Sequence, residues 1–167
     1  MKEDGPYWIK RLQLEPHAEG GFFKEIYRSP VNVAETFLPP GFRGERSFST
    51  CIYFLLLKGQ FSAFHRIASD ELWHFYAGDC LLIYELAKGG AFTEHRLGNQ
   101  TRNSEFFQVT IGAGNWFAAR LEKGGEFALV GCTVSPGFDF ADFELGSASQ
   151  LSAEFPGHRL LIETLTR

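Results

Sequence analysis

One stretch decides how this sequence is interpreted: residues 65–78, HRIASDELWHFYAG. It places two histidines and a glutamate among residues that favour β-strands, and a glycine ends it. Unpaired polar groups are costly in a core built from apolar strands. The histidines and the glutamate therefore either face a cavity that uses them, or each has a hydrogen-bond partner of its own.

The segments around this stretch predict a chain of short strands that end at glycines. We expect strands at 22–28, 49–57, 61–67, 71–77, 80–87, 91–97, 106–111, 116–121 and 127–134. Short strands that end at glycines, at a spacing of roughly 8–12 residues, are typical of a β-sandwich or β-barrel. The high content of aromatic residues, 16%, agrees with an all-β fold.

The remaining segments predict a short helix and a long loop near the N-terminus. Apolar residues recur at helical spacing over residues 7–14, before Pro16 blocks continuation. Residues 31–46 contain prolines and glycines and are predicted to form an irregular loop. Near the other end, residues 149–155 predict a short helix capped by Ser149, whereas 160–165 fits either a strand or a helix.

Composition limits the classes of function. A chain of 167 residues suits one domain, 1–167, with a sizeable core. A net charge of −4, with scattered Lys and Arg, argues against binding to nucleic acid or to a membrane surface. No apolar run approaches the roughly 18 residues of a membrane span. Three widely spaced cysteines without a CxxC pair fit buried reduced thiols, and with a polar N-terminus they predict a cytoplasmic protein.

The alternation of side chains along a strand places the polar residues of segment 65–78 on different faces. Alternate residues of a strand share a face, so Glu71 shares its face with Trp73, while His74 points the other way unless a bulge intervenes. His65 lies on the preceding strand, across a short turn. If both face inward, His65 and Glu71 lie within hydrogen-bonding or metal-ligating distance of each other.

The same spacing resembles the first cupin motif, in which a His-x-His pair is followed by Glu, six residues and Gly. Here Glu71 and Gly78 match, His65 fits the first histidine, and Ile67 occupies the position of the second. Residues 112–117, GAGNWF, resemble the second motif, with a phenylalanine in place of its ligand histidine. Two of the four usual metal ligands therefore remain.

A narrower resemblance covers nearly the whole chain. Four segments in order, 14–21 (LEPHAEGG), 69–75 (SDELWHF), 113–116 (AGNW) and 132–140 (CTVSPGFDF), resemble the cupin subfamily known as domain of unknown function 985. The resemblance implies a jelly-roll barrel, also called a double-stranded β-helix, with a short N-terminal helix. It also implies a homodimer.

Three functional hypotheses follow. The first is a cupin without a metal or other cofactor that binds a small molecule, such as a nucleotide or nucleotide-linked sugar. In isomerase or epimerase chemistry, His65 would remove a proton from the carbon next to a carbonyl, and Glu71 would orient His65 or balance its charge. Residues 20–25, GGFFKE, resemble the Arg-Gly-x-Phe-x-Glu run of cupin-fold keto-sugar epimerases, which need no metal.

The other two hypotheses differ in chemistry. The second is a metal-dependent dioxygenase or isomerase that holds a transition metal through His65, Glu71 and His74. The third is a non-catalytic ligand sensor or a storage-type cupin.

Further side chains are candidates for binding the ligand. An aromatic cavity with a few polar groups suits a planar ring or a sugar face, and the candidates are Tyr53, Trp73, His74, Phe75, Gln108 and Trp116. His17 and Glu19 lie beside a Gly-Gly turn. We interpret them as turn-stabilising residues, with lining of the cavity mouth as the alternative.

Overall fold

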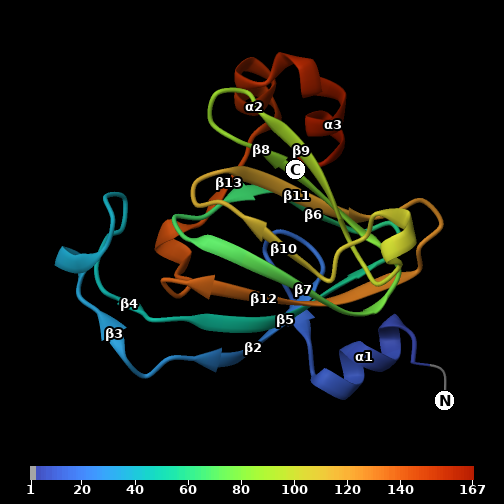
Figure 1. Cartoon of the computed structure of the whole chain (residues 1–167), viewed down its shortest axis with the longest axis horizontal. Helices are drawn as coiled ribbons and strands as arrows, with labels where there is room; N and C mark the ends of the chain where they lie inside the picture. The colour runs from blue at the N-terminus through green and yellow to red at the C-terminus, as the bar shows by residue number, and fades with distance from the viewer. Residues whose placement is uncertain (1–2) are drawn as a thin grey trace.

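Two antiparallel β-sheets pack face to face in a computed structural model that describes residues 3–167 (Figure 1). One sheet has the order β1 (Glu15–Pro16), β2 (Phe22–Arg28), β5 (Thr50–Leu57), β12 (Phe127–Ser135), β7 (Asp70–Gly78) and β10 (Gln108–Ile111). The other has the order β13 (Glu144–Leu145), β6 (Phe61–Arg66), β11 (Trp116–Leu121), β8 (Leu81–Leu86) and β9 (Phe92–Leu97). The predicted all-β jelly roll is confirmed.

The barrel interior is filled by alternate side chains of the two sheets. Phe54 from β5 and Trp73 from β7 meet Phe117 from β11, and all three are almost fully buried. Their rings pack edge to face: the centroids of Trp73 and Phe54 are 5.7 Å apart, and those of Trp73 and Phe117 are 6.3 Å apart. This aromatic layer lies beneath the polar residues of the candidate site.

Three helices cover the outside of the barrel. Helix α1 (Gly5–Leu12) begins after Asp4, whose carboxylate accepts a hydrogen bond from the Tyr7 N–H at 3.1 Å. It packs against the outer face of the six-stranded sheet around Leu55 and Leu129. Helices α2 (Ala148–Glu154) and α3 (Arg159–Thr164) cover the five-stranded sheet at the top of Figure 1.

Three local predictions need revision. Ser147 caps α2, not Ser149, because Ser147 is the last residue with extended backbone and its hydroxyl accepts from the Gln150 N–H. The ambiguous segment 160–165 is mostly helical. The predicted loop 31–46 contains the short pair β3 (Asn32–Val33) and β4 (Arg46–Ser47) and the 3-10 helix η1 (Glu35–Phe37).

Other connections carry the 3-10 helices η2 (Thr101–Asn103), η3 (Phe140–Asp142) and η4 (Pro156–His158). Helix η3 anchors β4, since the Arg46 guanidinium makes two hydrogen bonds of 2.7 Å with the Asp142 carboxylate. Within residues 3–167, no helix is long and apolar enough to cross a membrane.

Candidate functional site

A cavity of about 240 Å³ opens at the end of the barrel where β5 and β7 begin and β12 ends. This is the left-hand end in Figure 1. Its lining combines an apolar wall with a small set of titratable groups: His17, Glu19, Phe23, Glu25, Arg28, Thr50, Ile52, Phe54, His65, Ile67, Glu71, Cys132, Val134, Phe138, Asp139 and Phe140. Such a combination is typical of small-molecule sites.

Glu19 is placed in the cavity by the two glycines that follow it. Both Gly20 and Gly21 have positive φ angles, and a side chain on Gly20 would collide with the backbone carbonyl of Phe61. This close approach lets the Glu19 carbonyl accept a hydrogen bond from the Ala63 N–H at 2.9 Å. The Glu19 side chain is thereby carried into the barrel, where the Ser62 hydroxyl donates to its Oε1 at 2.8 Å.

His65 contacts Glu19 directly. Its Nε2 lies 3.0 Å from Glu19 Oε2, and its Nδ1 lies 2.7 Å from the carbonyl oxygen of Ala63. A carbonyl oxygen only accepts, so Nδ1 carries a proton and Nε2 faces the carboxyl group. One further proton is therefore shared between Glu19 Oε2 and His65 Nε2.

Burial decides where this shared proton lies. It lowers the pKa of His65 to about 4 and raises the pKa of Glu19 above its ordinary value. Both shifts favour the uncharged pair over the ion pair, with the shared proton on Glu19 and Glu19 donating to His65 Nε2. We call these two residues the Glu19–His65 pair.

Glu71 is a second uncharged acid in the same cavity. Burial raises the pKa of Glu71 to about 8, while a hydrogen bond with the Cys132 thiol opposes the shift. Glu71 is therefore mostly protonated at neutral pH, and a protonated carboxyl group is able to donate to a ligand oxygen.

Charged and aromatic groups surround the mouth of the cavity. The half-exposed Arg28 guanidinium donates hydrogen bonds to both carboxylate oxygens of Glu25, at 3.0 and 2.7 Å. Deeper in, burial lowers the pKa of His17, and its Nδ1 accepts from the Glu19 N–H at 3.3 Å. Its ring lies over Phe140 with an interplanar angle of 23°.

The predicted partner of His65 needs correction. His65 and Glu71 both line the cavity, as strand parity indicates, but the carboxylate in contact with His65 belongs to Glu19. The sequence alone predicts a turn role for Glu19, because the distance from Glu19 to His65 depends on how β6 packs beside the turn. The Glu-Gly-Gly run is the sequence signal for this contact, since its glycines bring the backbone close to β6.

Three other predicted ligand-binding residues lie on the outside of the six-stranded sheet, away from the cavity lining. The β7 bulge follows His74, opposite residues 129 and 130, so His74 keeps its outward parity and its Nε2 lies 3.1 Å from Thr133 Oγ1. Tyr53 packs with the cluster beneath α1 and against the Tyr76 ring. Gln108 is exposed on the edge strand β10.

The other three predicted aromatic residues also lie outside the cavity lining. Trp73 is within the barrel but below the cavity, and Phe75 packs beside it. Trp116 faces the opposite side of the five-stranded sheet, under α2, with the Arg66 guanidinium 4.3 Å from its ring centroid. The aromatic wall is formed instead by phenylalanines of β2, β5 and the segment after β12.

The residues at the cavity do not form the metal site that the cupin fold suggests. Ile67 lines the cavity in place of a histidine, and Phe117 packs on the His65 ring with the centroids 4.1 Å apart. His74 is turned outward, so the proposed set of His65, Glu71 and His74 is not brought together. Within residues 3–167, the one group of three potential ligands with mutually close atoms lies elsewhere: Cys80, Glu105 and Glu122.

A sequence profile of the family described as Cupin superfamily (DUF985) matches residues 6–146. The chain belongs to this cupin family. A curated relative, the uncharacterized protein YML079W of Saccharomyces cerevisiae, is 32% identical in an alignment of 146 residues, and the match covers 80% of this chain and 71% of the yeast protein.

Two solved structures of this cupin's relatives share the complete architecture. Protein SO0799 from Shewanella oneidensis has a TM-score of 0.87 and 40% identity, covering 99% of each chain. A hypothetical protein from Leishmania major has a TM-score of 0.89 and 33% identity, covering 98% of this chain and 99% of its own. The cupin assignment thus rests on sequence and on structure.

Proposed function

We propose that this cupin binds a small carbonyl or hydroxyl compound in the barrel cavity and moves protons on it, as isomerases and epimerases do. The observation that carries the proposal is the presence of two buried acid–base units, the Glu19–His65 pair and Glu71, around one cavity. Environments that hold buried acids uncharged at neutral pH are typical of acid–base catalysis.

The chemistry divides between the two units. Glu71 gives its carboxyl proton to a ligand carbonyl oxygen, while Glu19 takes a proton from the neighbouring carbon. Glu19 simultaneously passes its own proton to His65 Nε2, which leaves an imidazolium beside a neutral carboxyl group and a carboxylate at Glu71. Glu19 then returns a proton to the former carbonyl carbon and regains its own from His65, while the Glu71 carboxylate takes the hydroxyl proton of the neighbouring carbon, which gives the isomerised product. The net charge of the site is unchanged throughout.

The size and lining of the cavity indicate the class of ligand. Its 240 Å³ lies just below the roughly 300–1,000 Å³ of common ligand pockets, so a single sugar-sized ring or short chain fits inside. The half-exposed Arg28 at the mouth would exchange its present partner, the Glu25 carboxylate, for a phosphate or carboxylate that extends outward. A nucleotide-linked sugar meets both conditions, with its nucleotide outside the barrel.

The proposal is tested in two steps. Thermal-shift screening against keto-sugars, nucleotides and sugar nucleotides identifies binders, because a ligand at 100 times its Kd stabilises the folded state by about 2.7 kcal/mol. Each binder is then incubated in D₂O, and deuterium at carbon is followed by NMR. We expect exchange with the wild type and its loss in Glu71→Gln with binding retained. Binding without exchange for every ligand would contradict catalysis and favour a sensor.

We also propose that the protein forms a homodimer. The outer face of the six-stranded sheet carries aromatic side chains, including Tyr27 and Tyr76, which are about half exposed. Exposed apolar patches of this kind often mark protein interfaces. Sedimentation equilibrium of the wild type is expected to give twice the chain mass, and Tyr76→Glu is expected to give the monomer; a monomeric wild type would contradict the proposal.

A further inference from the structure

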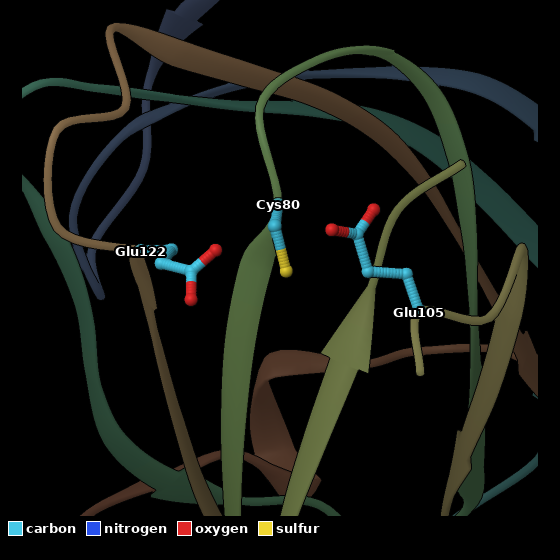
Figure 2. A group of neighbouring side chains, drawn as sticks. All are labelled: Cys80, Glu105 and Glu122. Carbon is cyan, nitrogen blue, oxygen red and sulfur yellow. The ribbon is translucent and has the colours of Figure 1, made fainter. Parts of the chain in front are cut away.

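A second group of metal-ligating side chains lies at the end of the barrel opposite the cavity. Cys80 directly precedes β8, Glu122 directly follows β11, and Glu105 lies between η2 and β10. Figure 2 shows the Cys80 sulfur pointing between the two carboxylates, which approach it from opposite sides. The wide spacing of these residues in the sequence hides them from a search for CxxC pairs.

The distances suit a small divalent cation. One ligand atom from each of the three residues lies within 4.8 Å of the other two. Zinc–sulfur bonds of about 2.3 Å and zinc–oxygen bonds of about 2.0–2.2 Å place tetrahedral ligands roughly 3–4 Å apart. Small rotations of the two glutamate side chains are enough to bring the ligand atoms from their present separation to the separation expected around a bound ion.

The Cys80 thiol supplies an independent indication of a missing partner. Its residue is only 7% exposed, and its sulfur makes no hydrogen bond within residues 3–167. The two carboxylates beside this thiol give the group a negative charge that attracts a cation.

Neighbouring groups hold the two carboxylates in place without using all of their oxygens. The Gln100 N–H donates to Glu105 Oε2 at 2.8 Å, and Arg96 Nη2 donates to Glu122 Oε1 at 2.7 Å. The second oxygen of each carboxylate is left for an ion. Arg96 compensates one of the two negative charges, so a net negative charge remains beside the thiol.

A polar recess gives access to the group. Cys80, Glu105 and Glu122 all line it, together with the side chains of Asn99 and Asn103. These amide side chains are able to hydrogen-bond a water molecule that completes the coordination of an ion.

We propose that Cys80, Glu105 and Glu122 bind a thiophilic divalent cation of the Zn²⁺ class, with water as the fourth ligand. The mixture of one sulfur and two carboxylate oxygens matches ligands that zinc accepts, whereas magnesium and calcium prefer oxygen alone. The site joins the turn that connects β7 to β8, the turn that connects β11 to β12 and the loop that precedes β10. It is independent of the proposed chemistry in the barrel cavity.

Titration with Co²⁺ tests the proposal, because a bound thiolate gives a charge-transfer band and a tetrahedral site gives intense visible bands. We expect both signals to saturate at one equivalent of Co²⁺ per chain and to be displaced by Zn²⁺. Cys80→Ser is expected to abolish the charge-transfer band. Glu122→Gln and Glu105→Gln remove direct ligands and are expected to weaken binding by at least the about 10–100-fold that loss of a supporting group causes in other metal sites.

Matched controls separate this site from other ligands. Cys51→Ser removes a cysteine on β5, and Glu126→Gln removes an exposed glutamate from the same β11–β12 turn as Glu122. Both are expected to bind Co²⁺ as the wild type does. Absence of the band in the wild type, or its persistence in Cys80→Ser, would overturn the proposal. If Cys80→Ser does not fold, unchanged affinity in both glutamate variants would overturn it.

Discussion

Replacement of Glu71 by glutamine tests the protonation of the cavity through the pH dependence of stability. The fold raises the pKa of Glu71 from 4.5 to about 8. An acid with a higher pKa in the folded state binds its proton more tightly there than in the unfolded chain. The folded state is therefore destabilised as the pH rises from 4.5 to about 8.

The structure also gives the size of this effect. A change of this size in the pKa of one group corresponds to about 5 kcal/mol once the pH exceeds both values, and to about 3 kcal/mol at neutral pH. Glutamine keeps the shape of the protonated carboxyl group and cannot ionise. The free energy of unfolding of Glu71→Gln is therefore expected to exceed that of the wild type by an amount that grows with pH.

Urea unfolding followed by tryptophan fluorescence measures this difference, since Trp73 and Trp116 are almost fully buried. The two proteins are compared at intervals from about pH 4 to about pH 9, which spans the window from 4.5 to about 8. Glu163→Gln, at an exposed glutamate paired with Arg159, is the control and is expected to give a small, constant difference. Parallel stability curves for the wild type and Glu71→Gln would refute the reasoning.

The remaining predictions concern the elements that position the site. Gly20→Ala is expected to lower the free energy of unfolding by about 2 kcal/mol or more, because the positive φ and the Phe61 carbonyl leave no room for a methyl group; an unchanged urea midpoint would contradict this. Arg46→Leu leaves the buried Asp142 unpaired and is expected to cost about 3–5 kcal/mol, with Asp142→Leu in the same chain recovering part of it. The lowered pKa of His65 predicts that the free energy of unfolding falls by about 3 kcal/mol as the pH falls from 6.5 to about 4, and this loss should be absent in His65→Gln. If urea unfolding shows the same decrease with falling pH in both proteins, the prediction is contradicted.

Strand periodicity was enough to place His65 and Glu71 in the barrel. Both lie on strands with one face in the interior, where alternate residues must turn inward. The same alternation predicts that His74 points outward, and this prediction requires no knowledge of the tertiary structure. The glycine-ended strands likewise predicted the two sheets.

Other features depend on contacts that periodicity does not contain. Trp116 lies on β11, which is buried on both faces because α2 and α3 cover the outer one, so its apolar character does not reveal which way it points. Tyr53 alternates with Phe54, and only the packing shows that Phe54 takes the inner face. The contact between Glu19 and His65 requires the turn at Gly20 to lie against β6, which is a tertiary arrangement.

The protonation state of His65 tests the central claim most directly, because the proposed chemistry depends on the proton shared in the Glu19–His65 pair. Nitrogen-15 NMR of the histidine rings distinguishes the two neutral tautomers from the imidazolium, with His65→Gln to assign the signals. We predict that His65 at neutral pH is uncharged, with the proton on Nδ1 and with Nε2 accepting from Glu19, and that it stays so down to about pH 4. A His65 protonated on Nε2, or one that titrates near its ordinary pKa of 6.5, would contradict the account.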